Sequence, residues 1–163
     1  MTWTLQEDDM SVDLGSKAPD FTLTSHERQP VVLSQHRGKP VVLAFFPAAF
    51  SSVCEKELCT FRDSMARLNQ AKAHVYGISV DTFFTLKAFH DQQKLTFPLL
   101  SDFNKEVIHE YGVLNENMIG LKGIAKRAVF VLDKDGVVRY REVLEDARNE
   151  PNYEKVFEAV ARV

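Results

Sequence analysis

Cys54 is the residue of this 163-residue chain whose position best suits nucleophilic chemistry. It ends the segment PAAFSSVC, directly after an apolar run over 41–46 that predicts a buried strand, and residues 55–69 after it have helical spacing. A cysteine at a strand-to-helix junction receives the free N–H groups and the positive dipole end of the helix. Both effects stabilise the thiolate, which is the reactive form of the side chain. The sequence therefore predicts a reactive cysteine here, against the alternative of an inert core cysteine.

Cys59 is the only other cysteine, and the pair favours redox or catalytic chemistry over a structural disulfide. The C-x-x-x-x-C spacing differs from the C-x-x-C of thiol–disulfide transfer proteins, which argues against that class. None of the five histidines has metal-ligand spacing, so we expect neither a zinc site nor a copper-delivery module. No metal or organic cofactor is expected.

Composition and charge narrow the range of partners. The chain is 45% hydrophobic and 26% charged, as in soluble globular proteins, and its formal charge of −3 gives no sign of a nucleic-acid or membrane partner. Its apolar runs are too short to span a bilayer, and its acidic start lacks the apolar core of a signal peptide. We expect a cytoplasmic protein, with a polar N-terminal lead over 1–15 and a single domain over 16–163.

Strand and helix patterns alternate along the chain. Extended segments are predicted at 18–23, 31–33, 41–46, 75–80, 97–100, 128–132 and 137–143, and helices at 55–69, 81–92, 105–111 and 153–163. The last two strands are joined by a turn over 133–136, with Gly136 where a positive φ is needed. This order predicts an α/β fold: a thioredoxin-like domain whose mixed central sheet has helices on both faces, with an N-terminal β extension.

The segment Pro47-x-x-x-Ser51-x-x-Cys54 resembles the active-site signature of peroxiredoxins. Two further landmarks fit this family: Glu57, three residues past the cysteine, and Arg127, which opens the strand RAVFVLD. The resemblance runs from residue 15 to the last helix. It implies that the protein is a thiol-dependent peroxidase acting on hydrogen peroxide and organic hydroperoxides, with Cys54 as the nucleophile.

The resemblance also implies a role for each neighbouring residue. Arg127 and Ser51 would bind and polarise the peroxide, Pro47 would shield the thiolate from water, and Glu57 would orient Arg127 through a bidentate pair. Plainer roles stay open for two of them. Ser51 suits the N-cap of the helix, and Glu57 suits its first turn, where a carboxylate is favourable.

Cys59 resembles the resolving cysteine of the bacterioferritin-comigratory branch of the family. Five residues along a helix advance about 7.5 Å and rotate about 140°, which leaves the two Cα atoms more than ~8 Å apart. A disulfide needs Cα atoms within ~7 Å, so the helix must unwind locally before Cys54 and Cys59 can join. The disulfide would then be reduced by thioredoxin or another thiol.

Two alternative functions stay open. FFPAAF and ELCTFRD also resemble the alkyl-hydroperoxide-reductase-E-like group, in which a one-cysteine enzyme is resolved by an external thiol. A redox-sensing or holdase binding protein would share the oxidation chemistry without turnover. The resemblance is compatible with a monomer or a homodimer. The loop over 115–123, with its apolar Met118, Ile119 and Leu121, is expected to border the site.

Overall fold

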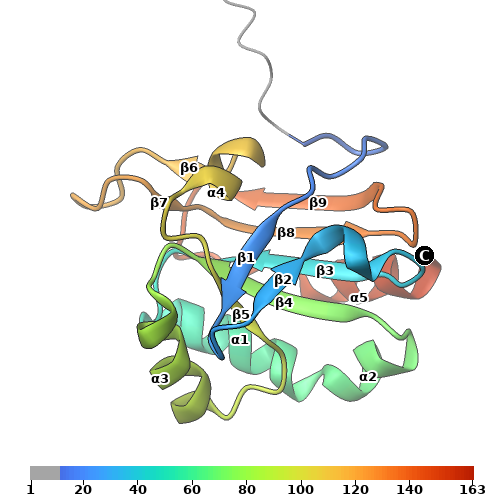
Figure 1. Ribbon diagram of the computed structural model, residues 1–163, viewed down its shortest axis with the longest axis horizontal. Helices are drawn as coiled ribbons and strands as arrows, with labels where there is room; N and C mark the ends of the chain where they lie inside the picture. The colour runs from blue at the N-terminus through green and yellow to red at the C-terminus, as the bar shows by residue number, and fades with distance from the viewer. Residues whose placement is uncertain (1–11) are drawn as a thin grey trace, which may run out of the picture.

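The structure is a computed structural model that describes residues 12–163, and its centre is a seven-stranded mixed sheet (Figure 1). The strand order is β2-β1-β5-β4-β3-β8-β9, and a two-stranded sheet pairs β6 with β7. The strands are β1 (Thr22–Ser25), β2 (Pro30–Val32), β3 (Val41–Phe45), β4 (His74–Ser79), β5 (Leu99–Ser101), β6 (Leu114–Asn115), β7 (Ile124–Ala125), β8 (Arg127–Leu132) and β9 (Val138–Leu144). The helices are α1 (Ser52–Asp63), α2 (Met65–Gln70), α3 (Phe83–Gln93), α4 (Glu106–Glu110) and α5 (Tyr153–Arg162), with a short 3-10 turn, η1 (Leu33–His36).

Strand β3 is an inner strand of the sheet, between β4 and β8, and is buried on both faces. It pairs in parallel with β4 and antiparallel with β8, and all five of its residues are buried. Successive side chains of a strand point to opposite faces, so Leu43 and Phe45 enter one core while Val42 and Ala44 enter the other. A continuous apolar run is therefore what this position requires.

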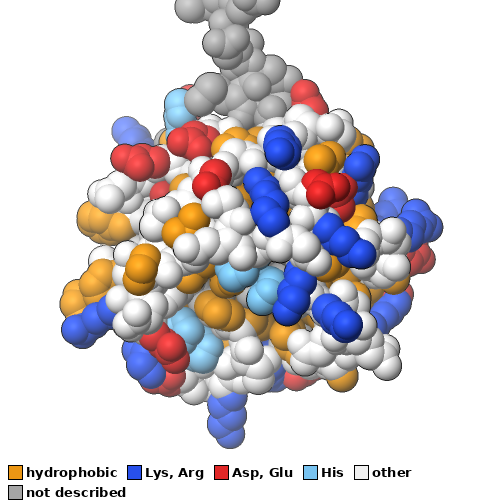
Figure 2. Space-filling view, turned by 45° about the vertical axis from the view of Figure 1, so that its right-hand side comes forward, with side chains coloured by type: hydrophobic (Ala, Val, Ile, Leu, Met, Phe, Trp, Pro, Cys, Tyr) orange, Lys and Arg blue, Asp and Glu red, His pale blue; other side chains and the backbone are white. Residues whose placement is uncertain are grey.

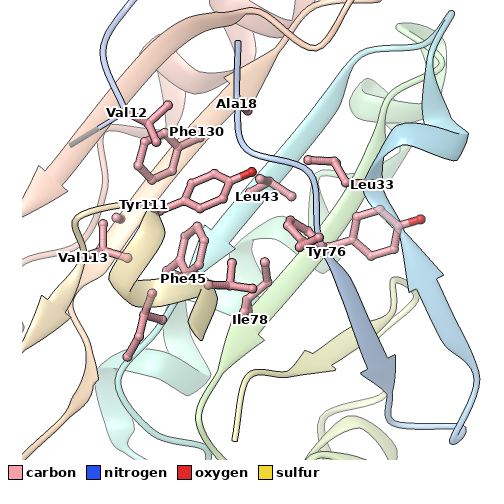
Figure 3. Packing of buried hydrophobic residues seen from close by; sticks show 14 of the residues in the cluster. Val12, Ala18, Leu33, Leu43, Phe45, Tyr76, Ile78, Tyr111, Val113 and Phe130 are labelled. Atoms are coloured by element: carbon pink, nitrogen blue, oxygen red, sulfur yellow. The ribbon is translucent and has the colours of Figure 1, made fainter. Parts of the chain in front are cut away.

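The first core lies between the sheet, α4 and the N-terminal segment, and is shown in Figure 3. Tyr111 packs against two other aromatic rings of this core. The centroid of its ring is 5.4 Å from that of Phe45 and 5.5 Å from that of Phe130. Its buried hydroxyl donates a hydrogen bond to the Pro19 carbonyl at 2.6 Å. Val12 packs into the same core, so the described end of the N-terminal lead is attached to the domain.

The second core lies under α1, α2, α3 and α5, which cover the other face of the sheet. The spacing of the Cys54 segment predicts an apolar stripe of Leu58, Phe61, Met65 and Leu68; three of these are buried, and Met65 is half-buried against the same core. The helix is not continuous, however. Ser64 leaves the helical conformation (φ −100°, ψ 5°) and ends α1 while starting α2. The single helix expected over 55–69 is therefore wrong at this point.

The fold class predicted from the sequence is confirmed: the sheet is mixed and helices cover both faces. Gly136 has the positive φ (79°) expected in the β8–β9 turn. The first strand is displaced, because β1 begins at Thr22 instead of Ala18. Asp20 explains the shift, since its Oδ1 accepts hydrogen bonds from the backbone N–H groups of Phe21 and Ser34. The domain boundary after residue 15 stays a prediction, and residues 1–11 of the lead lie outside the described residues.

Histidine side chains lie on the face of the molecule drawn in Figure 2, between apolar and basic side chains. His26 and His90 stack with ring centroids 3.8 Å apart, and His36 Nε2 is 2.6 Å from the Tyr76 hydroxyl. Burial lowers the pKa of His26 and of His36, so both rings are neutral near neutral pH. None of the helices within residues 12–163 has the length and apolar character that a membrane span requires.

Candidate active site

Cys54 lies in the first turn of α1, two residues after the first helical residue, Ser52. The residue is fully buried, and its thiol is free. The first-turn N–H groups of a helix have no partner within the helix, and they carry the positive end of its dipole. The helix starts before the cysteine and not after it, so Cys54 belongs to this first turn. Its sulfur is therefore close to an electropositive helix end.

Arg127, the first residue of β8, reaches the cysteine from 73 residues away in the chain. Because Ala128 pairs with Phe45, Arg127 lies at the edge of the sheet where β3 ends and the Cys54 segment begins. Its Nη1 donates a hydrogen bond to Cys54 Sγ at 3.3 Å, and its side chain is only 1% exposed. The Ala147 carbonyl also holds the guanidinium in place: it accepts hydrogen bonds from Arg127 Nε at 3.3 Å and from Arg127 Nη2 at 2.9 Å.

Glu57 completes a buried trio with these two residues. Its Oε1 accepts a hydrogen bond from Arg127 Nη1 at 3.4 Å, while Oε2 has no partner within the described residues. The bidentate pair expected from the sequence is therefore wrong: one oxygen makes the contact. The carboxyl group is fully buried, and this desolvation outweighs the nearby guanidinium and raises the pKa of Glu57 to about 8.

The charge balance of the trio follows from that pKa. When Glu57 is neutral, it does not compensate the positive charge of Arg127, which then interacts with the sulfur of Cys54. A buried pair of opposite charges is compatible with the protein interior, whereas a second uncompensated anion is not. The arrangement therefore presents the positive charge of Arg127 to Cys54 Sγ so long as Glu57 keeps its proton.

A cleft of about 760 Å³ opens above the trio, at the edge of the sheet. Pro47, Ser51 and Arg127 line it, whereas the fully buried Cys54 does not. The opposite wall comes from the loop over 115–123 and from the segment after β9, and it includes Asn115, Asn117, Met118, Ile119, Glu145, Asp146, Ala147 and Arg148. The loop over 115–123 thus borders the site as expected. Leu121 is not among the lining residues.

Ser51 occupies the N-cap position of α1, with extended backbone angles (φ −72°, ψ 145°). Its hydroxyl makes no capping hydrogen bond, although serine is favoured at this position for that bond. The side chain is exposed and lies in the cleft instead. The hydroxyl is therefore available to a molecule in the cleft.

Cys59 lies apart from the trio, in the middle of α1. The residue is half-buried, and its Sγ donates a hydrogen bond to Gln93 Oε1, at the end of α3, at 3.3 Å. Burial raises the pKa of its thiol. The two cysteines are thus held by different partners on one continuous helix, which cannot bring them within disulfide distance.

Several groups that shape this region have no recognisable signal in the sequence. Asp81 fixes the loop before α1, because its Oδ2 accepts hydrogen bonds from the Ala49 N–H at 2.8 Å and the Ser79 hydroxyl at 2.7 Å. Ala147 acts through its backbone carbonyl, which no residue type can signal. Gln93 directly follows the helix predicted over 81–92, and no local pattern indicates its partner.

The fold and this arrangement define a thioredoxin-fold protein with one cysteine held by a helix N-terminus and an arginine. Residues 14–141 match the model of the AhpC/TSA family, and the chain belongs to that family. It is 45% identical over 128 residues to a chloroplastic peroxiredoxin Q of Sedum lineare, covering 78% of this chain and 67% of the relative. It is 41% identical over 135 residues to an alkyl hydroperoxide reductase E of Mycobacterium bovis, covering 81% and 86% respectively.

Among solved structures, the peroxidoxin BcpB of Mycobacterium tuberculosis superimposes with a TM-score of 0.84 at 30% identity, over 93% of this chain and 98% of that one. The chain spans 58% to 67% of the length of the chloroplastic relatives in Sedum lineare and Triticum aestivum. Family, fold and relatives together assign it peroxidase activity that depends on a thiol.

Proposed function

We propose that Cys54 is the thiol that reduces the peroxide and that Cys59 resolves the oxidised product. The observation that carries the first part is the 3.3 Å hydrogen bond from Arg127 Nη1 to Cys54 Sγ, in the first turn of α1 and beneath the cleft. The substrates are hydrogen peroxide and small organic hydroperoxides. The cleft volume and the apolar Met118 and Ile119 in its wall support access for the organic ones.

In the first step the Cys54 thiolate attacks one peroxide oxygen and the O–O bond breaks. The sulfur becomes a sulfenic acid, and the other oxygen leaves as hydroxide or alkoxide, which takes a proton to give water or an alcohol. Arg127 is placed to stabilise the negative charge as it moves from sulfur to the leaving oxygen. Ser51 holds the peroxide by its hydroxyl, and Pro47 limits the access of water.

In the second step Cys59 converts the sulfenic acid to a disulfide. The Cys59 sulfur bonds to the Cys54 sulfur, and the sulfenic hydroxyl leaves as water after taking the thiol proton. Because α1 is continuous from Ser52 to Asp63, its N-terminal half must unwind for this bond to form. A reductant, which we take to be thioredoxin or another small thiol, then restores both thiols.

The same proposal covers location and assembly. We place the protein in the cytoplasm, where two free thiols stay reduced between turnovers. Either a monomer or a homodimer is consistent with one self-contained site per chain. Light scattering of the reduced and the oxidised protein distinguishes these two assemblies.

The experiment that tests the proposal is intact-mass spectrometry after one equivalent of hydrogen peroxide. The reduced protein is compared with its Cys59→Ser variant. A loss of about 2 Da in the parent and a gain of about 16 Da in the variant are expected, for a disulfide and a sulfenic acid respectively. A similar gain in both proteins would reject Cys59 as the resolving residue and leave a one-cysteine peroxidase. Unchanged masses in both would reject Cys54 as the reacting thiol.

A further inference from the structure

Gln93, the last residue of α3, contacts α1 through both its side chain and its backbone. Its Oε1 accepts the hydrogen bond from Cys59 Sγ, and its carbonyl oxygen accepts one from Arg62 Nη1. Cys59 and Arg62 are three residues apart and therefore lie on the same side of α1. Two neighbouring α1 side chains thus converge on one residue of α3.

The position of Gln93 at the end of α3 is fixed by the conformation and packing of that helix. The helix stops at Gln93 because Lys94 adopts the left-handed conformation (φ 51°, ψ 45°). Carbonyl groups in a last turn have no helical N–H partner and carry the negative end of the dipole, which a guanidinium satisfies well. Leu86 and Phe89, both fully buried, hold the helix in the second core. The contact point is therefore fixed by packing that α1 does not control.

The contact affects the chemistry of Cys59 in two ways. A thiol can donate a hydrogen bond to an amide oxygen only while it is protonated, so Gln93 stabilises the unreactive form. The contact also directs Sγ toward α3, whereas Cys54 Sγ faces Arg127 on β8. Cys59 must leave Gln93 before it can reach Cys54.

We propose that Gln93 is a positioning residue that latches Cys59 to α3 as a thiol and so limits how often α1 opens for resolution. This inference rests on the proposed role of Cys59. While the latch is closed, the sulfenic acid on Cys54 persists, and a second peroxide can oxidise it to the sulfinic acid with release of water or alcohol. The strength of the latch therefore sets the peroxide concentration at which the enzyme inactivates itself.

The first test compares Gln93→Ala with Gln92→Ala, which removes the same side chain from an exposed neighbour on α3. Loss of one neutral hydrogen bond shifts the opening equilibrium about threefold to tenfold. Reduced proteins are mixed with increasing hydrogen peroxide, and the fraction of sulfinic acid is read by intact mass. We expect half inactivation of Gln93→Ala to require at least about threefold more peroxide than that of the parent. The reason is that Cys59 resolves the sulfenic acid faster in this variant, before a second peroxide can oxidise it. Gln92→Ala matches the parent, and the rate of Cys54 oxidation is the same in all three.

The second test follows alkylation of Cys59 by iodoacetamide across pH on a Cys54→Ser background, where no disulfide can form. Gln93→Ala accelerates alkylation about threefold and moves its midpoint to lower pH. Gln93→Glu, which keeps an acceptor and adds negative charge, slows it. This readout does not depend on whether Cys59 resolves the sulfenic acid. If the parent protein forms no disulfide with peroxide, the proposed resolving role of Cys59 is rejected, and the alkylation result still tests the contact with Gln93. The latch is rejected if Gln93→Ala and Gln92→Ala share the same alkylation profile and the same peroxide threshold.

Discussion

Cys54 and Cys59 lie five residues apart on α1 and have contrasting surroundings. Cys54 is fully buried in the first turn, where its sulfur accepts a hydrogen bond from the Arg127 guanidinium. Cys59 is less buried, but its thiol donates to the neutral Gln93 amide. A cationic donor stabilises a thiolate, whereas a neutral acceptor stabilises a thiol.

In the proposed function the more deeply buried thiol is the one that attacks peroxide, so burial alone does not decide which thiol reacts. Burial raises the pKa of the Cys59 thiol. The two sulfurs differ in their hydrogen-bond partners, because Arg127 supplies positive charge at Cys54 and Gln93 supplies an acceptor at Cys59. In the proposed function, the same helix therefore carries one thiol that attacks peroxide and another that is held back until the helix opens.

Removing each thiol in turn gives the largest expected contrast. Cys54→Ser lowers the second-order rate of peroxide reduction at least about a thousandfold, because the nucleophile is lost. Cys59→Ser leaves the rate of the first step within about twofold of the parent, since it touches none of the trio. Single-turnover consumption of hydrogen peroxide measures both rates. Equal losses in the two variants would contradict the division of roles.

Substitutions of Arg127 are expected to have the next largest effect on the rate at which Cys54 reacts with peroxide. Arg127→Ala lowers the rate of the first step about a hundredfold, and Arg127→Lys, which keeps the charge without the forked donor, lowers it about tenfold. Arg139→Ala is the matched control, because that arginine is half exposed and pairs with Asp133 away from the cleft. If Arg127→Ala behaves like Arg139→Ala, the guanidinium does not act on the sulfur.

The titration of Glu57 makes the stability of the folded protein depend on pH. A carboxyl whose pKa is raised to about 8 stabilises the folded protein most below its ordinary pKa, and this stabilisation is lost as the pH rises through about 8. We expect the free energy of unfolding to fall by a few kcal/mol, in order of magnitude, between about pH 5 and about pH 9. Urea unfolding of the parent and of Glu57→Gln measures this, and the variant removes that part of the slope.

Activity responds to the same titration. Above about pH 8 an ionised Glu57 competes with Cys54 for the charge of Arg127, so the rate of the first step declines in the parent and not in Glu57→Gln. Glu55→Gln, which changes a partly exposed carboxylate in the same turn, keeps the parental profile. A parental decline retained in Glu57→Gln would assign it to another group.

The smallest expected effect separates the two roles considered for Ser51. Because its hydroxyl makes no capping hydrogen bond, Ser51→Ala lowers the free energy of unfolding by only a few tenths of a kcal/mol, less than the ~1 kcal/mol typical of a lost cap. The rate of the first step falls about fivefold to tenfold through the lost contact to peroxide. Ser52→Ala, its neighbour in the cleft, is the control. A large loss of stability with an unchanged rate would favour the capping role.

Much of the fold could be predicted because burial leaves a clear pattern in the sequence. The run over 41–46 is apolar on both faces, since β3 is covered on both sides. The break at Ser64 could not be predicted in this way, because Leu58, Phe61 and Leu68 continue one stripe across it. Periodicity indicated the helix only from residue 55, because Ser51 and Ser52 have no apolar pattern, and its start at Ser52 was indicated only by the suitability of Ser51 as an N-cap.

The site was predictable where side-chain types carry the information. A cysteine after a buried strand and an arginine at the start of an apolar strand are unusual enough to be noticed, and the family resemblance supplied their pairing. The proton state of Glu57 depends on complete burial and on one orphaned oxygen, which only the packed structure reveals. The Ala147 carbonyl and the Gln93 amide act across loops and helices with no local pattern.

The interruption at Ser64 limits how far a local melting event can spread. Helix formation is cooperative, so a helix that loses its first two turns tends to lose the remainder as well. Because Ser64 leaves the helical conformation between α1 and α2, we expect fraying that begins at Cys54 to stop at the end of α1. Leu68 stays in the second core, and α2 keeps its place beside α5. In the proposed mechanism, the break makes α1 a separate unit of twelve residues that opens and refolds while the rest of the domain stays intact.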